Sequence, residues 1–205
     1  MTRRSWLKKF LGASEEGVYF LGIQLIIRAF GEDTLRARLA HVIADPEGAM
    51  EDVEAKRRYI KRIVALLLEQ EPYWSQAFWD YKTDPEESQA EFDSWEAELS
   101  ASTATEEEEM GDEIDRAHRL SHNKDFICVT MIFNLSVPFS PAGEFNSELE
   151  YWRRETLSKL VRGLLLINPE DILADGVFVI PGNSEDGLSE EDLLTGGWSH
   201  LRYLT

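Results

Sequence analysis

Cysteine and long apolar runs are both scarce in this sequence. Of its 205 residues only Cys128 is a cysteine, so no disulfide can form within the chain, which fits a reducing compartment. The longest apolar run, residues 18–30, is interrupted by Gln24 and Arg28 and is too short and too polar to predict a transmembrane helix. Residues 1–14 begin with cations but lack the apolar core and cleavage site of a signal peptide. We therefore predict a cytoplasmic protein.

Cations are also scarce, and they are unevenly placed. The sequence holds 21 Lys and Arg against 39 Asp and Glu, a formal net charge of −18. Residues 1–62 contain 12 of these cations and 9 of the acids and carry a net +3, whereas residues 63–205 carry −21. Nucleic acids are bound through clustered Lys and Arg, so this composition excludes them as the main partner. It predicts two electrostatically distinct faces, which serve either solubility or the binding of a basic protein surface.

Recognisable catalytic motifs are absent. There is no Gly-x-Ser-x-Gly nucleophile motif, no Gly-rich phosphate loop and no dinucleotide-binding fingerprint. The loop at residues 182–191 is acidic but lacks the ligand spacing of a calcium-binding EF-hand. Cys128 lies in an apolar, strand-like run, which is typical of a buried structural thiol. We assign no catalytic residue and predict no cofactor.

Helical spacing dominates the beginning of the sequence. Apolar residues recur near a 3.6-residue period over residues 16–43, and the first half of this stretch is apolar almost all round, as in a central core helix. Residues 51–69 predict a second helix with one apolar and one basic face. Asp84 followed by Pro85 predicts the start of a third.

Two further segments extend this helical part. The aromatic block at residues 73–81 (YWSQAFWDY) predicts a packed helix, with a ligand-stacking surface as the alternative. Residues 100–110 have the composition of a loop that ends in four consecutive Glu. Thr105 is placed to cap a helix that begins with these acids and ends near His122.

The remainder of the sequence changes to strand-like patterns. Residues 126–133 (FICVTMIF) predict a strand buried on both faces, a helix follows over about 147–166, and residues 177–180 predict a second strand. A long helical connection favours a right-handed crossover between parallel strands. The predicted fold class is α+β, with an N-terminal helical layer (15–122) followed by a small strand–helix–strand (βαβ) unit (125–205).

Several segments, in their order and spacing, resemble one known family. They are residues 66–74 (LLLEQEPYW), 125–133 (DFICVTMIF), 165–180 (LLINPEDILADGVFVI), 188–194 (LSEEDLL) and 200–204 (HLRYL). By this resemblance the chain is identified as a divergent member of domain-of-unknown-function family 1517, over about residues 18–204. The resemblance implies a relation to cyanobacterial and chloroplast proteins linked to thylakoids and to acclimation to fluctuating light. It implies no catalytic residues, and the transmembrane stretch that other members carry upstream is lacking here.

A pair of histidines forms a candidate metal site. His118 and His122 are four residues apart and share one face of a helix, and Asp115 lies about one turn earlier. Arg119 lies between the histidines, and a neighbouring cation opposes metal binding. The other interpretation is a pair of surface histidines whose charge is favoured by the dipole at a helix C-terminus. We therefore assign no metal site and keep these three residues as candidates.

A basic amphipathic segment, residues 1–14, precedes a single domain at 15–205. Within residues 2–12 the apolar side chains fall on one helical stripe with four cations around it. This pattern is typical of an interfacial membrane anchor and also of an ordinary N-terminal helix. The candidate contacts to a membrane or a partner are Arg3, Arg4, Trp6, Lys8, Lys9 and Phe10.

Together these features favour a non-enzymatic accessory or adaptor protein. It would act through protein–protein contacts, with peripheral membrane contact through residues 2–12 as a further possibility. The alternative is a metal-dependent enzyme or metal-binding protein that uses His118 and His122. The sequence leaves the identity of the partner and the oligomeric state open.

Overall fold

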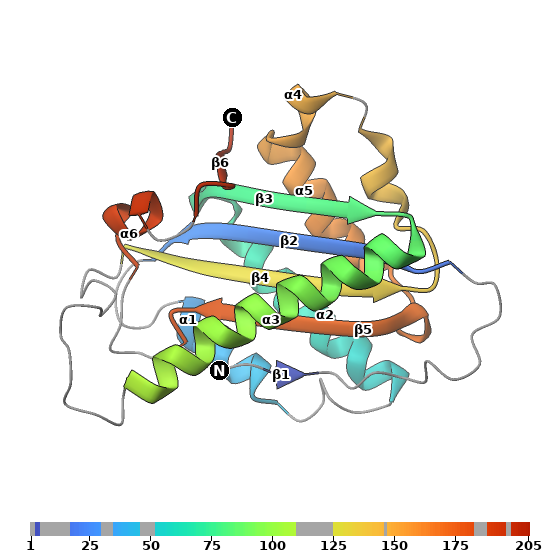
Figure 1. The fold of residues 1–205 in the computed structure, drawn as a ribbon, viewed down its shortest axis with the longest axis horizontal. Coiled ribbons are helices and arrows are strands. Elements are labelled where there is room, and N and C mark those ends of the chain that lie inside the picture. The colour runs from blue at the N-terminus through green and yellow to red at the C-terminus, as the bar shows by residue number, and fades with distance from the viewer. Residues whose placement is uncertain are drawn as a thin grey trace.

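Six strands form one antiparallel sheet, which lies at the centre of the fold (Figure 1). The structure is a computed structural model that describes residues 3–4, 17–29, 35–45, 52–109, 125–145, 147–182, 188–195 and 198–205. The strands are β1 (Arg3–Arg4), β2 (Tyr19–Arg28), β3 (Trp74–Lys82), β4 (Phe126–Leu135), β5 (Ile172–Ile180) and β6 (Arg202–Tyr203). Their order across the sheet is β1-β5-β4-β2-β3-β6, and all neighbours are antiparallel.

Helices connect most of the strands. The α-helices are α1 (Leu35–Ile43), α2 (Val53–Glu69), α3 (Pro85–Glu109), α4 (Glu148–Tyr151), α5 (Arg154–Gly163) and α6 (Glu190–Thr195). Short 3-10 helices shape the turns between them: η2 (Glu71–Tyr73), η3 (Ser140–Glu144), η4 (Leu164–Leu166) and η5 (Pro169–Asp171).

Strand β2 shows that the helix predicted over residues 16–43 is wrong in its first half. Every residue from Phe20 to Ile27 is buried, because helices cover both faces of the sheet at this strand. A strand buried on both faces is apolar all round, and so is a central core helix, so the spacing of apolar residues does not separate the two. The second half of the stretch is helical, as α1.

The aromatic block at residues 73–81 is also a strand rather than the predicted helix. It forms β3, which pairs with β2 along its length. Its side chains alternate between the two sides of the sheet, with Ala77 and Trp79 in one apolar cluster and Phe78 packed against the other. Aromatic residues fit a pleated, half-buried surface well, and this preference determines the structure here.

The strand predicted at residues 126–133 is confirmed as β4, and all of its residues are buried. Its neighbour β5 is antiparallel to it, so the predicted parallel βαβ unit is wrong. The connection over residues 136–171 contains two short helices, α4 and α5, in place of the single helix predicted at 147–166. The chain enters β5 at the end of the sheet where it left β4, since Leu135 pairs with Ile172.

Two predicted helix starts are confirmed. The helix predicted over residues 51–69 is present as α2 (Val53–Glu69), and α3 begins at Pro85. The Asp84 carboxylate caps α3 by accepting hydrogen bonds from two backbone N–H groups of its first turn, both at 3.0 Å. The loop predicted at residues 100–110 is wrong, since α3 continues to Glu109. Ala and Glu in this segment are good helix formers, which favours continuation of the helix.

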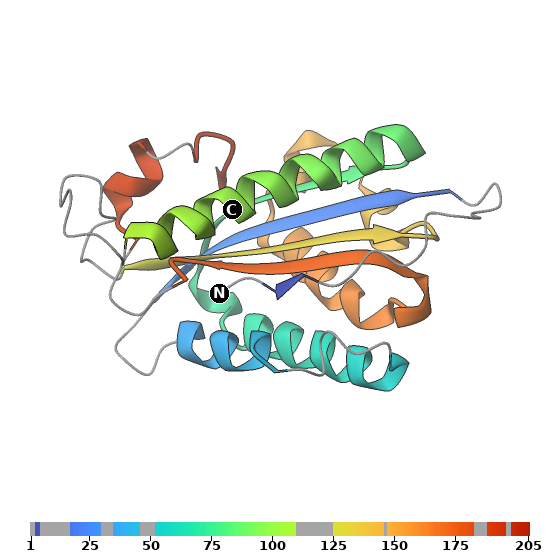
Figure 2. The ribbon, with the colours of Figure 1, turned by 60° about the horizontal axis from the view of Figure 1, so that its bottom comes forward.

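Two helical layers cover the sheet (Figure 2). Helices α1, α2 and α5 cover one side, here called the α2 face, and α3 crosses the other side diagonally, here called the α3 face. Alternate residues of each strand point to opposite faces, so Ile23 and Met131 pack on the α2 face and Phe20 and Ile132 on the α3 face.

The chain therefore mixes α and β structure, but the predicted arrangement is wrong. An N-terminal helical layer followed by a small strand–helix–strand unit does not occur, because two of the four long strands, β2 and β3, lie within residues 15–122. The two helical layers instead enclose one sheet built from both halves of the sequence.

Candidate functional site

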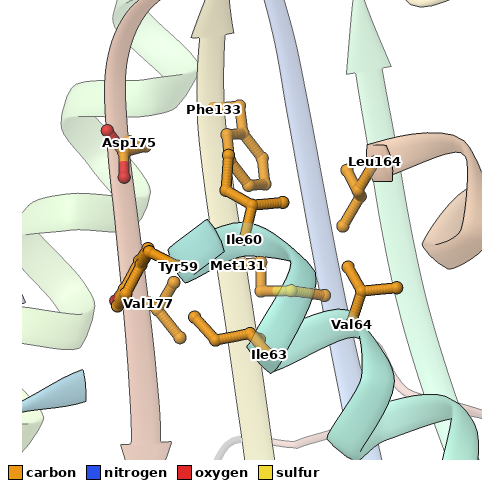
Figure 3. A pocket seen from close by; sticks show the side chains of 9 residues that line it. All are labelled: Tyr59, Ile60, Ile63, Val64, Met131, Phe133, Leu164, Asp175 and Val177. Carbon is orange, nitrogen blue, oxygen red and sulfur yellow. The ribbon is translucent and has the colours of Figure 1, made fainter. Parts of the chain in front are cut away.

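A small cavity lies between α2 and the sheet on the α2 face (Figure 3). Residues of α2 line one side, and Met131, Phe133 and Val177 close it from the sheet. Its volume is about 10 Å³, which is close to the minimum for one water molecule and far below that of a small-molecule pocket. Its lining is apolar apart from the Asp175 carboxylate. This cavity is therefore a packing gap rather than a ligand site.

A buried ion pair at the edge of this cavity joins α2 to β5. Lys56 Nζ donates to both carboxylate oxygens of Asp175, at 2.7 and 2.9 Å. The two side chains are only 10% and 4% exposed. Each charge compensates the desolvation of the other, and both Asp175 oxygens are occupied. The pair therefore holds the fold together and does not present a free acid or base for catalysis.

A chain of polar side chains crosses the sheet on the α3 face. His200 Nε2 lies 2.6 Å from Gln24 Oε1, and Gln24 Nε2 donates to Thr130 Oγ1 at 3.1 Å. Thr130 Oγ1 lies 3.7 Å from Cys128 Sγ at the buried end of the chain. These buried polar atoms satisfy one another, as an apolar environment requires.

Cys128 is a buried thiol, as predicted. Burial raises the pKa of its thiol to about 12. The sulfur is therefore neutral near pH 7 and unsuited to act as a nucleophile. His200 reaches it only through Gln24 and Thr130, so the two do not form a catalytic Cys–His pair.

Half-buried aromatic side chains form a row that begins on the α3 face with Phe78 and Trp95 and continues to Trp152, which packs against the apolar cluster of the α2 face. Phe78 stacks with Trp95 of α3 at a centroid distance of 5.9 Å and an angle of 24°, and with Trp152 at 6.0 Å and 19°. The His200 ring meets the edge of Phe78 at 5.1 Å. Glu91 Oε1 accepts a hydrogen bond from Trp95 Nε1 at 2.8 Å. The aromatic row (Phe78, Trp95 and Trp152) is therefore joined directly to the acidic surface of α3.

Helix α3 carries a strongly acidic surface beside this row. Its 25 residues include ten Asp or Glu and no Lys or Arg. The side chains of Glu86, Glu87 and Asp93 are exposed, and none of the three forms an ion pair with another described residue. Near the start of the helix, the hydrogen bond to Asp80 raises the pKa of Lys82, and nearby α3 acids add to the effect.

Helix α2 carries the opposite charge, but its exposed charges are largely paired. It contains five Lys or Arg and two Glu. The surface pairs that involve α1 and α2 are Arg38–Glu69 at 2.7 Å, Arg57–Glu54 at 3.7 Å and Arg62–Asp45 at 2.6 Å. Helices α2 and α3, which carry net charges of opposite sign, therefore lie on opposite faces of the sheet, and they differ in how far the charges of their described side chains are neutralised locally.

The candidate metal ligands His118, His122 and Asp115 lie outside the described residues. Within the residues that the structure describes, no group of three or more His, Cys, Asp or Glu side chains is placed to hold a metal ion. The histidine pair therefore stays a prediction.

The basic N-terminal segment is described only in part. Arg3 and Arg4 form strand β1, which pairs with Val177 and Gly176 of β5, so these two residues lie in the sheet rather than in a helix. Outside the described residues lie Trp6, Lys8, Lys9 and Phe10. The contact of residues 2–12 with a membrane or partner therefore stays a prediction. No helix in the described part of the chain is both long and apolar enough to span a bilayer.

Sequence reasoning does not find the contact between Gln24 and His200. These residues are 176 positions apart, and only the folded sheet brings them together. Gln24 within an apolar run is nevertheless a usable signal, because a polar side chain in a buried strand needs a partner. For the aromatic block that contains Phe78, the predicted helix is wrong, and the alternative of a ligand-stacking surface stays a prediction.

The fold and these surfaces define the class of protein: an α+β domain whose antiparallel sheet lies between an apolar, charge-paired helical layer and an acidic one. Residues 20–196 match the family described as "Protein of unknown function (DUF1517)". The chain belongs to that family, as its sequence motifs indicate. No curated protein and no solved structure matches the chain.

Proposed function

We propose that this protein is a non-enzymatic adaptor that binds a basic protein surface through its α3 face. The observation that supports the proposal is the position of the exposed, unpaired acids of α3 beside the half-buried aromatic row. Protein interfaces commonly combine aromatic side chains in the centre with charged residues at the rim. The α3 face offers both in one place.

Unpaired charges favour binding because no existing ion pair has to be broken. Lys or Arg of a partner would meet Glu86, Glu87 and Asp93 directly, and the negative field of α3 would accelerate the encounter. On the α2 face most of the exposed cations already have acidic partners, so an acidic protein would gain less there. The adaptor would act in the cytoplasm, and residues 2–12 would add membrane contact if they bind lipid.

Matched variants on the two faces test this proposal. We compare the tagged wild-type chain, an α3 variant (Glu86→Gln, Glu87→Gln, Asp93→Asn) and an α2 control (Arg57→Gln, Lys61→Gln) in affinity pulldowns at low salt. We expect the wild type and the control to recover the same protein and the α3 variant to lose it. Three exposed charges together correspond to roughly a tenfold or greater loss of affinity.

Salt provides a second measurement on the same samples. Because exposed charges are screened over about 8 Å at physiological ionic strength, recovery by the wild type should fall as salt is raised. If the α3 variant and the α2 control recover the partner equally, the α3 face does not carry the function. Recovery of no partner by the wild type at low salt would also contradict the proposal.

A further inference from the structure

One side of α3 combines acids with an aromatic ring and borders strand β3. Glu87, Glu91 and Trp95 follow one another at spacings of four residues, so they are neighbours on this side of the helix over about 12 Å. Trp95 stacks with Phe78 of β3 at a centroid distance of 5.9 Å. These three residues of α3 are here called the α3 stripe.

The indole ring of Trp95 is held at both of its ends. Its six-membered ring lies against β2, where a Cβ added at Gly22 would be 2.9 Å from Cη2. At the opposite end of the indole, Nε1 donates to Glu91 Oε1 at 2.8 Å. The Trp95 side chain is only partly buried. The α3 stripe therefore presents an aromatic surface of fixed orientation with a carboxylate at its rim.

The carboxylates of the α3 stripe are not neutralised by nearby cations. Neither Glu87 nor Glu91 forms an ion pair with another described residue. Glu87 is exposed, and Glu91 uses Oε1 for the bond to Trp95. A donor from outside the chain would therefore meet two charged acceptors beside one aromatic ring.

Lys82 shows that a cation is attracted to the end of this stripe. Its Nζ lies 3.0 Å from Asp80 Oδ2 on the same strand. The hydrogen bond to Asp80 raises the pKa of Lys82, and the negative charges of Glu91 and Glu87 add to the effect. One cation is thus set against three carboxylates, so the surface around the stripe remains net negative.

We propose that the basic partner of the α3 face binds the α3 stripe through arginine rather than lysine. A guanidinium would lie against Trp95 and donate to Glu87 and Glu91. This inference rests on the proposed binding of a basic protein surface and names the side chain that makes the contact. A guanidinium is planar, weakly hydrated and carries five N–H donors, so it can stack on a ring and bond two carboxylates together. The ammonium of lysine is a compact and strongly hydrated charge, which uses the ring less well.

The same features disfavour other occupants of the stripe. Nucleic acids and lipid headgroups carry phosphates, which a net negative surface repels. A metal ion needs several converging ligands, and no group of three or more His, Cys, Asp or Glu within the described part of the chain is placed to hold one. The aromatic ring beside the acids fits a guanidinium best.

Two six-residue peptides, one of arginines and one of lysines, test the inference by calorimetric titration of the full chain at about 0.15 M salt. We expect the wild type to bind the arginine peptide about threefold to tenfold more tightly. Trp95→Leu removes the ring and should bring the two dissociation constants to within about twofold. Glu91→Gln keeps an acceptor for Trp95 Nε1 but removes the charge, so it should weaken binding of the arginine peptide by about threefold or more.

A matched control removes the same charge elsewhere. Glu155 is exposed on α5 and forms no ion pair with a described residue, so Glu155→Gln should leave both dissociation constants unchanged. Circular dichroism confirms that each variant is folded.

The indole N–H signals in a ¹⁵N NMR spectrum locate the contact without any variant. The Nε1–H signal of Trp95 should shift in a saturable way as the arginine peptide is added. Trp74 is 2% exposed, and its Nε1 donates to Leu67 O at 3.2 Å on the α2 face, so its signal should not move.

The outcomes separate this inference from the adaptor proposal. Equal affinity of the wild type for the two peptides overturns the arginine inference and leaves the adaptor proposal to its own pulldown. An arginine preference that persists in Trp95→Leu, or a Trp95 signal that is unmoved at saturation, also overturns it, because arginine then binds elsewhere. If neither peptide binds, the inference fails, and the adaptor proposal fails with it only if the wild type also recovers no partner at low salt.

Discussion

The two faces of the sheet differ in how completely they are packed and paired. Among the described residues, 31 buried apolar residues form the cluster of the α2 face and 13 form that of the α3 face. On the α3 side two buried polar atoms, Ser88 Oγ and Asn134 Oδ1, have no hydrogen-bond partner among the described residues. The exposed acids Glu86, Glu87 and Asp93 of α3 form no ion pair with another described residue, whereas the described cations of α1 and α2 are mostly paired.

This difference indicates a division of roles. The larger cluster and the paired charges of the α2 face supply most of the stability of the fold, because burial of apolar area is the dominant favourable contribution to folding. Helix α3 is attached by fewer buried side chains, chiefly Phe92 and Leu99. The exposed acids of α3 therefore belong to the less extensively packed face, and the proposed binding of a basic partner rests on them.

The largest expected effect is the loss of the buried ion pair on the α2 face. Lys56→Ala leaves the Asp175 carboxylate desolvated and without its partner, which should lower the free energy of unfolding by about 3–5 kcal/mol. Urea denaturation measures the change. Replacing both residues at once (Lys56→Met with Asp175→Leu) should recover most of the loss, since no charge is left buried. A double variant as unstable as the single one would show that the pair is not what joins α2 to β5.

A smaller effect is expected where α3 meets the sheet. A Cβ at Gly22 would lie 2.9 Å from the ring of Trp95, so Gly22→Val should push α3 away from β2 at a cost of about 1–3 kcal/mol. Hydrogen exchange should show lost protection in α3 but not in α2, because the α2 face is untouched. Gly143→Ala is the control, since a Cβ there meets no atom within 4 Å. Loss of protection in both helices together would contradict the separation of the two faces.

The pKa of Cys128 provides a pH-dependent test of how dry the α3 face is. Burial raises the pKa of this thiol from 9.0 to about 12, so the folded state favours the protonated form. The stabilisation that the raised pKa of this thiol provides is complete below about pH 9. It is lost as pH rises towards 12, by about 1.4 kcal/mol per pH unit. Urea unfolding of the wild type and Cys128→Ala should therefore diverge by roughly 1 kcal/mol between pH 8 and 10. Identical pH profiles would mean that water reaches the thiol in the folded state.

Sequence reasoning predicts the parts of this fold that carry local signals. Asp84 before Pro85 marks the start of α3, and Ser189 with Asp192, at the spacing of a capping box, caps α6 with hydrogen bonds of 2.6 to 3.3 Å. Such caps depend on neighbouring residues alone, so they are visible without the fold.

The errors all concern segments whose structure is decided by distant contacts. Strand β2 is buried on both sides because α2 and α3 cover it. The presence of these two helices is not evident from residues 19–28 themselves. The antiparallel pairing of β4 and β5 joins strands separated by residues 136–171, and neither strand carries a local signal for its direction. For the candidate site, the charge asymmetry is predictable from the sequence, but its placement on opposite faces requires the sheet topology.

The smallest expected effect is a change in stability whose sign differs between a surface-charge variant on the α3 face and one on the α2 face. Asp93→Asn on α3 removes an acid three residues from Glu96 and keeps the acceptor for Gln89 Nε2, so it should stabilise the chain by about 0.2–0.5 kcal/mol. Arg57→Gln on α2 loses the pair with Glu54 at 3.7 Å and should destabilise by a similar amount. Thermal unfolding at low salt measures both changes, and both should shrink at 1 M salt, where the Debye length is about 3 Å. If both variants shift stability in the same direction, the charges of α3 are neutralised within the chain, and the case for an external basic partner is lost.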